Sequence, residues 1–222
     1  MHPIARIEND FPTKFALPRQ SLLSGSLLSR VVFEPEYRNA DALRGLEGFS
    51  HIWLIWEFSG FKDRGWSPTV RPPRLGGNVR MGVFATRSPN RPNPLGLTCV
   101  KLEQIVTDPQ DGPVLIVSGA DMMSGTPIYD IKPYVREADC HPDAADGFVG
   151  QTPRRTLEVT VSPGRREELL SELSERQFET LVEVLSQDPR PSYHDDPERV
   201  YGFPYAGLEL HFRVSGQTLE LL

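Results

Sequence analysis

The chain has 222 residues, a formal net charge of −6 at pH 7 and two cysteines. This length predicts one domain, or one domain with a small appendage, and the composition is that of a globular protein with a sizeable core. No apolar run is long enough for a transmembrane helix, and residues 1–15 lack the apolar stretch of a secretory signal. Cys99, in an apolar run, and Cys140, in a polar one, predict free thiols in a reducing cytoplasm.

The first two thirds of the chain predict many strands and almost no helix. A helical turn is expected at 41–46, and strands are expected at 1–8, 26–33, 49–58, 80–85, 95–107, 114–119 and 128–131. We expect both Trp53 and Trp56 to lie in the core. Strands without intervening helices favour a closed or nearly closed antiparallel β-barrel over a βαβ sheet. The sequence therefore predicts a mainly β fold, with the barrel over residues 1–142.

The pattern changes after a polar stretch at 136–154, of which residues 143–154 are predicted to be a linker. A strand is expected at 156–161 and a helical segment at 165–187, which a capping box of Ser174 with Gln177 divides and Asp188-Pro189 ends. Alternation at 207–214, followed by Ser215-Gly216, predicts a hairpin with 218–222. Residues 155–222 are thus predicted to be a small α+β domain.

One long segment, Arg64 to Leu102, carries seven positive charges and no acidic residue, although the whole chain is acidic. This pattern indicates a site for an anion, either a phosphate backbone or a carboxylate ligand, with a solvated basic surface as the alternative. Within it, Val83–Ala85 are suited to a strand that Pro89 ends. Pro92 and Pro94 stiffen the loop that follows, so that Arg87 and Arg91 are expected to project from a fixed backbone.

Several familiar sites are excluded by their motifs. The sequence has no GxGxxG after a strand, no phosphate-binding GKS or GKT loop, no GxSxG, no HExxH and no CxxC. The five histidines lack metal-ligand spacing, and His51, the only one in an apolar run, is expected to be structural or to line a cofactor site. A Rossmann nucleotide site and a metal-dependent hydrolase are therefore not supported.

Two further polar segments are ambiguous. Asp130 and Lys132 share a face of a strand, which fits either a simple ion pair or, with Tyr134, a functional cluster. The second segment, DPRPSY at 188–193, combines an acid, an arginine and an aromatic residue on a stiff turn. It fits either contact with RNA phosphate and bases or a turn that ends a helix.

The motifs KFALPRQ, GFSHIW, VRPPRLGG, GVFATRSPNRPNPLGL and DIKPY, followed by DPRPSY, together resemble the TsaA/TrmO family. The resemblance runs in order from about residue 4 to residue 135 and resumes at 188–193. Departures lie at Asn90, where an aromatic residue is common, and at residues 9–12, where Ser-Pro is common. The resemblance implies S-adenosylmethionine-dependent methylation of N6 of threonylcarbamoyl-adenosine at tRNA position 37, by a homodimer whose barrel binds the cofactor without a Rossmann sheet.

The resemblance also implies residue roles. The cofactor-binding residues would be Pro18, Arg19, Gln20, His51, Ile52, Arg87, Leu97, Ser118, Gly119, Ala120 and Asp121. Arg87 would grip the methionine carboxylate of the cofactor, because a guanidinium does so bidentately. Asp130 and Tyr134 are the two possible catalytic bases. The residues expected to bind tRNA are Arg71, Arg74, Arg91, Lys132, Asp188, Arg190 and Tyr193.

No metal and no membrane contact are expected. Because the cofactor motifs precede the linker, we expect the barrel to bind cofactor by itself and the C-terminal domain to assist tRNA binding. The alternative to an enzyme is a non-catalytic barrel that binds RNA or a nucleotide. Binding of S-adenosylmethionine distinguishes the two hypotheses.

Overall fold

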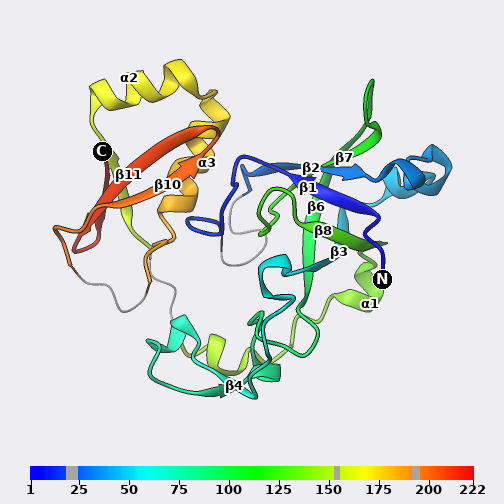
Figure 1. Cartoon of the computed structure of the whole chain (residues 1–222), viewed down its shortest axis with the longest axis horizontal. Helices are drawn as coiled ribbons and strands as arrows, with labels where there is room; N and C mark the ends of the chain where they lie inside the picture. Colours follow the sequence, from blue (N-terminus) through cyan, green and yellow to red (C-terminus); the bar gives the residue numbers. More distant parts are fainter. Residues whose placement is uncertain (19–24, 153–155, 192–195) are drawn as a thin grey trace.

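The computed structural model describes residues 1–18, 25–152, 156–191 and 196–222. Strands dominate over helices, so the mainly β prediction is confirmed. Figure 1 shows a ring of strands near the N-terminus and a smaller unit of strands and helices that ends at the C-terminus, with the two termini at opposite ends of the molecule. None of the helices in these residues has the length and apolar character needed to cross a membrane.

Six strands hydrogen-bond to one another in a closed ring of order β1-β2-β7-β6-β3-β8, and every neighbouring pair is antiparallel. The ring consists of β1 (Ala5–Glu8), β2 (Leu28–Phe33), β3 (His51–Glu57), β6 (Leu95–Asp108), β7 (Gly112–Ser118) and β8 (Pro127–Pro133). Closure leaves none of these strands with an unpaired edge, which would otherwise be open to aggregation.

Strict alternation along β3 shows how the ring forms its core. Ile52, Leu54 and Trp56 are buried inside, whereas Trp53 is only half-buried on the outer face. The expectation that both tryptophans lie in the core is therefore wrong for Trp53, because neighbouring residues of a strand point to opposite faces. The Trp56 ring lies across Gly96, where an added Cβ would come within 2.2 Å of it.

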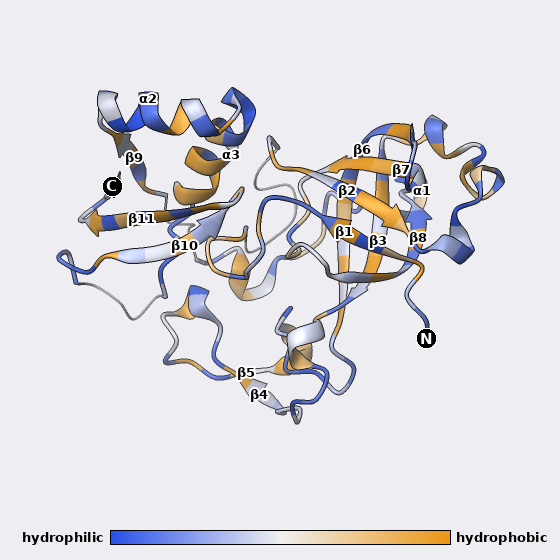
Figure 2. Ribbon diagram, turned by 45° about the horizontal axis from the view of Figure 1, so that its top comes forward, coloured by the Kyte–Doolittle hydropathy of each residue, from blue (hydrophilic) through white to orange (hydrophobic). Residues whose placement is uncertain are grey.

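A long excursion leaves the ring between β3 and β6 and contains most of the basic segment. It holds a two-stranded ribbon of β4 (Thr69–Val70) and β5 (Met81–Gly82), which lies apart from the ring in Figure 2. The strand predicted at 80–85 is thus only two residues long, and Val83–Ala85 form a 3₁₀ turn. These residues form a turn and not a longer strand because the carbonyl of Val83 accepts a hydrogen bond from the amide of Thr86, 3.1 Å away, instead of from a neighbouring strand.

The C-terminal unit is a four-stranded sheet of order β10-β11-β12-β9, in which only the β12/β9 pair is parallel. Its elements are β9 (Glu158–Val161), α2 (Pro163–Glu172), α3 (Glu175–Leu185), β10 (Tyr201–Tyr205), β11 (Leu208–Ser215) and β12 (Thr218–Leu221). The predicted capping box at Ser174 and Gln177 and the predicted hairpin, in which Ser215 faces Thr218, are both confirmed. The sequence did not predict β10, whose Gly202 and Pro204 are tolerated because it is an edge strand. The stretch expected to be a polar linker begins with a short helix, α1 (Arg136–Asp139).

The connection between β1 and β2 belongs to the core of the C-terminal unit. Phe11, Ala16 and Leu27 are buried in the same cluster as the side chains of α3 and β10–β12. The Phe11 ring lies 4.8 Å from that of Tyr205, and the amide of Ala206 donates to the carbonyl of Asp10 at 3.0 Å. The ring and the C-terminal unit are therefore joined by shared apolar packing as well as by the chain between them.

Candidate functional site

The segment 118–121, called here the 118–121 turn, begins with the last residue of β7 and is held by its neighbours. The Thr98 hydroxyl of β6 donates to Asp121 Oδ1 at 2.7 Å and accepts from Trp56 Nε1 at 2.9 Å. Ser118 Oγ donates to Glu103 Oε1 at 2.6 Å, and Ala120 is fully buried. Four predicted cofactor residues, Ser118 to Asp121, are thus fixed on one turn at the end of the ring.

The same turn contacts the connection that carries Pro18. The amide of Gly119, which has a positive φ of 80°, donates to the carbonyl of Leu27 at 3.1 Å. Pro18 is buried on this connection. The predicted cofactor residues Arg19 and Gln20 lie outside the described residues.

Of the other predicted cofactor residues, three lie on different faces of the ring and Arg87 lies on the excursion between β3 and β6. His51 points outward, with Nδ1 2.9 Å from Ser50 Oγ, and Leu97 is 57% exposed on the same outer face. Ile52 points inward and is fully buried, so its side chain belongs to the core. Arg87 is exposed, and no hydrogen bond or ion pair joins its guanidinium to another described residue.

The outer face of β6, β3 and β8 brings predicted catalytic and cofactor residues together. Asp130, Ile55 and Leu97 are cross-strand partners in one row, and Lys132 and Trp53 occupy the next. Partners in antiparallel strands point to the same side of a sheet, so these side chains are neighbours. Asp130 Oδ2 lies 3.0 Å from Lys132 Nζ, which is the ion pair that the sequence offered as one of two readings.

Tyr134 lies at the end of this face, with its ring 5.9 Å from that of Trp53 and 6.1 Å from that of His51. Burial raises the pKa of Tyr134 above its usual value, and the neighbouring Cys140 and Asp139 raise it further. The phenol therefore keeps its proton to a higher pH than a free tyrosine does.

The arginines of the basic segment differ in their hydrogen bonds and in their exposure. Arg91 donates to the backbone carbonyls of Thr86 at 2.7 Å, Val83 at 3.3 Å and Ser88 at 3.4 Å, so it fixes the loop that carries Arg87. Arg74 Nε donates to a carbonyl of the predicted linker, that of Thr152, at 3.1 Å, whereas Arg71 is exposed.

The DPRPSY segment forms a turn that ends the helical region. Arg190 is only 8% exposed and makes two hydrogen bonds to Asp188, Nε to Oδ1 at 2.8 Å and Nη2 to Oδ2 at 3.0 Å. Asp188 has a positive φ of 52°. This geometry corresponds to the alternative of a helix-ending turn, while contact of the two residues with RNA stays a prediction. Tyr193 lies outside the described residues.

Three residues of the site were missed by sequence reasoning. Thr98 and Glu103 support the 118–121 turn, and Asp139 Oδ2 accepts from Trp53 Nε1 at 3.1 Å and from the amide of Val135 at 2.8 Å. The sequence contained a pattern that could have indicated Thr98, because a threonine at an inward position of an apolar strand needs a hydrogen-bond partner. No such pattern indicated Asp139, since its partner lies 86 residues away in the sequence.

In the part of the chain that the structure describes, these features define a class of protein: a closed ring of antiparallel strands, without a Rossmann sheet, that carries an exposed arginine loop and a hydrogen-bonded segment after β7. No group of three potential metal ligands occurs among the residues that the structure describes. The sequence profile of the tRNA-methyltransferase O N-terminal domain matches residues 6–140, and that of the TrmO C-terminal domain matches residues 154–222. The chain therefore belongs to the tRNA-methyltransferase O family, and the resemblance noted in its sequence is confirmed.

Individual relatives agree over nearly the whole chain. A protein of Escherichia coli strain K12 named tRNA (adenine(37)-N6)-methyltransferase is 39% identical, over 98% of this chain and 94% of its own length. A protein of Pseudomonas aeruginosa named putative S-adenosylmethionine-dependent methyltransferase RcsF is 38% identical, over 95% of this chain and 90% of its own. The crystal structure of TrmO from Pseudomonas aeruginosa superposes with a TM-score of 0.78 at 32% identity and covers 100% of this chain and 98% of that one.

Proposed function

We propose that this chain is an S-adenosylmethionine-dependent methyltransferase that methylates N6 of threonylcarbamoyl-adenosine at position 37 of tRNA. The observation that carries the proposal is a match to both family domains, together with a relative named tRNA (adenine(37)-N6)-methyltransferase that aligns over 98% of this chain. A requirement for the threonylcarbamoyl group follows from the family resemblance.

The residues around the 118–121 turn fit such a cofactor. The amide of Ala120, a fully buried residue, donates to no other described residue, and a buried amide of this kind needs an acceptor. Arg87 offers an exposed guanidinium for the carboxylate of the methionine part. When bound, S-adenosylmethionine supplies a methyl group on a positively charged sulfur, so the protein has chiefly to align the acceptor nitrogen with it.

The acceptor nitrogen of threonylcarbamoyl-adenosine is part of a urea and must lose a proton. We assign this role to Asp130, because its carboxylate lies on the same row of the outer face as Leu97, a predicted cofactor residue. Lys132, paired with Asp130 at 3.0 Å, would hold the carboxylate in place.

We further propose that the ring acts as a β-barrel over residues 1–142, joined by residues 143–154 to an α+β domain over 155–222. The outer face of β6, β3 and β8 would form the interface of a homodimer, because Leu97 is 57% exposed there and Trp53 and Ile55 lie beside it. The enzyme would act in the cytoplasm. Exposed Arg71 would contribute to the sequence-independent part of tRNA affinity, which should fall as salt rises.

The test of this function is methyl transfer to two tRNA samples, one carrying threonylcarbamoyl-adenosine at position 37 and one with unmodified adenosine there. We expect transfer only to the first, and S-adenosylmethionine at about a hundredfold over its Kd should stabilise the protein by about 2.7 kcal/mol. A protein that binds tRNA but shows neither effect would be the non-catalytic RNA-binding barrel instead.

Arg87→Ala provides a sharper test of the cofactor assignment. The substitution should weaken S-adenosylmethionine binding by about 1.5–3 kcal/mol, the range for a hydrogen bond to a charged group. Arg80→Ala is the matched control, since Arg80 is an exposed arginine of the same segment that bonds to Thr69. Unchanged cofactor affinity in Arg87→Ala would remove Arg87 from the site.

A further inference from the structure

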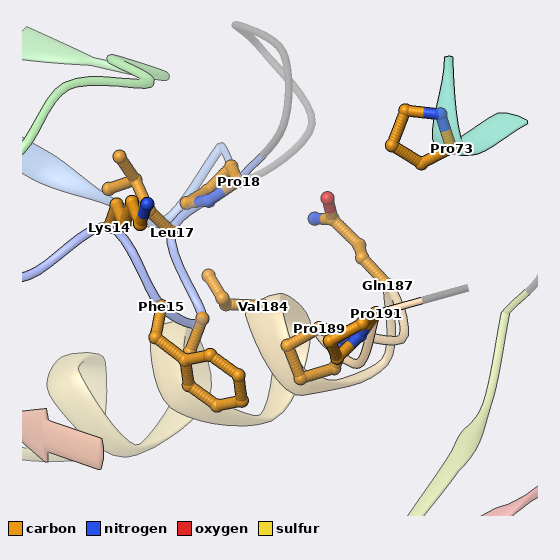
Figure 3. Close-up of a pocket in the computed structure, with 10 residues that line it drawn as sticks. Lys14, Phe15, Leu17, Pro18, Pro73, Val184, Gln187, Pro189 and Pro191 are labelled. Atoms are coloured by element: carbon orange, nitrogen blue, oxygen red, sulfur yellow. The ribbon is translucent and has the colours of Figure 1, made fainter. Parts of the chain in front are cut away.

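A cavity of about 400 Å³ lies where the two units of the chain meet. Figure 3 shows prolines from three distant segments around it: Pro18 from the β1–β2 connection, Pro73 from the basic segment, and Pro189 and Pro191 from the turn after α3. The remaining lining residues are Lys14, Phe15, Ala16, Leu17, Val184 and Gln187. Three family motifs that lie far apart in the sequence thus each contribute a wall of the cavity: KFALPRQ, VRPPRLGG and DPRPSY.

The wall from the C-terminal unit is built rigidly. The two hydrogen bonds between Arg190 and Asp188 fix the backbone on either side of Pro189, and the guanidinium is buried in doing so. Phe15 is held from behind by the rings of Tyr201 and Phe212, at 6.3 and 6.2 Å. Because the walls are already ordered, a ligand entering the cavity would lose little free energy to rearrangement.

The chemistry of the cavity selects a flat group with apolar faces and a polar edge. Among the residues that the structure describes, its walls are mainly proline rings and aliphatic carbon, and Lys14 and Gln187 bring polar ends to it. Arg71 and Arg74 lie within two residues of Pro73 in the sequence, so the segment that forms this wall also carries positive charge. A nucleobase attached to a phosphate backbone matches both features, and the volume lies within the range of small-ligand pockets.

We propose that this cavity receives one unpaired nucleobase of the tRNA anticodon loop, other than the methylated adenine. The inference rests on the proposed function and adds to it a binding site that the C-terminal unit shares with the ring. Asp188 and Arg190 then shape the site through their ion pair, and the prolines on either side of Arg190 contact the base.

The experiment fills the cavity from one wall. Gln187→Trp places a large ring in it, and Glu179→Trp, on the exposed surface of α3, is the matched control. The probes are S-adenosylmethionine and a short anticodon stem-loop RNA with threonylcarbamoyl-adenosine at position 37. We expect Gln187→Trp to weaken RNA binding about tenfold or more, the size of one lost stacking contact, with cofactor affinity and Tm unchanged. The control should match wild type.

Pro73→Trp, which fills the cavity from the opposite wall, provides a second variant should Gln187→Trp fail to fold. A series of stem-loops with one abasic site at each unpaired position other than 37 then identifies the base. One of these RNAs should bind wild type about tenfold more weakly and lose nothing further with the filled variant, because both changes remove the same contact.

Three results would overturn the inference: a filled variant that binds RNA like wild type, one that loses cofactor affinity instead, or one that changes its oligomeric state. Failure of the proposed function looks different. In that case wild type itself neither binds S-adenosylmethionine nor methylates tRNA.

Discussion

The strand ring and the C-terminal unit follow the same rule along their strands but differ in their loops. In β3 and in β11 every second side chain is buried, so both units form their cores by simple alternation. In the loops, however, Arg87, on the excursion between β3 and β6, is exposed and lacks a described partner, whereas Arg190 of the C-terminal unit is buried against Asp188. An arginine on a proline-containing loop can therefore either stay exposed, as Arg87 does, or hold a turn in shape, as Arg190 does.

The two units also differ in how independent they are. The C-terminal core contains Phe11, Ala16 and Leu27, which precede most of the ring in the sequence, while the cluster inside the ring contains no buried residue from beyond position 128. Among the described residues, the C-terminal unit therefore depends on the N-terminal segment for its own packing. The β1–β2 connection in turn depends on the C-terminal unit.

Truncation after Gly150 would remove the C-terminal unit, and with it the packing that this unit shares with the β1–β2 connection. We expect a loss of more than tenfold in S-adenosylmethionine affinity and a large fall in Tm, because Phe11, Ala16 and Leu27 lose their core and Leu27 anchors the 118–121 turn. Calorimetric titration and thermal melting measure both effects. A truncated ring that binds cofactor as tightly as the full chain would show instead that the ring is self-sufficient, as the sequence motifs alone suggested.

Arg190→Ala should have the next largest effect. Removing one partner of a buried ion pair typically costs about 3–5 kcal/mol, and the side chains of Arg190 and Asp188 are only 9% and 15% exposed. The matched comparison is Arg213→Ala, which removes a pair with Glu220 whose side chains are both 47% exposed, and exposed pairs contribute at most about 1 kcal/mol. Denaturant unfolding compares the two variants, and equal losses would mean that Arg190 is not the structural arginine described above.

Gly96→Ala tests the packing of the ring. An added Cβ would lie 2.2 Å from the Trp56 ring, so the tryptophan must shift and strain the β3–β6 pair. Overpacking of this kind costs about 1–3 kcal/mol. Gly82→Ala is the control, since its Cβ would meet nothing within 4 Å. Thermal melting should show a lower Tm for Gly96→Ala alone, and an unchanged value would mean that the ring core tolerates the extra methyl group.

The smallest expected effect is on the pH dependence of stability, to which Tyr129 and Tyr205 contribute for different reasons. A hydrogen bond to Glu57, helped by burial, raises the pKa of Tyr129 to about 12, whereas burial is the main cause that raises that of Tyr205. The pKa of Tyr129 is thus higher in the folded state than its unfolded value of about 10. Its contribution to the free energy of unfolding is therefore complete below pH 10 and disappears as pH rises through about 12. Tyr129→Phe should therefore flatten part of the stability decline above pH 10, measured by unfolding in denaturant. An identical decline in the variant would contradict the Glu57 bond.

Local chemistry in the sequence determined much of the fold. The Ser174 capping box divided the helical segment, Ser215-Gly216 placed the hairpin, and alternation located the main strands within a few residues. These features depend on residues close in sequence, whose backbone preferences act before any distant contact forms. The motifs likewise indicated which loops carry the candidate site.

Only the tertiary structure decided which of two physically reasonable roles each residue takes. The sequence allowed Arg190 to bind phosphate or to pair, placed Trp53 in the core, and assigned the β1–β2 connection to the ring. The structure pairs Arg190, turns Trp53 outward to bond Asp139, and buries Phe11 in the C-terminal core. Each outcome depends on a partner that folding brings close, or on which face of a strand meets the core, and neither is encoded in the spacing of nearby residues.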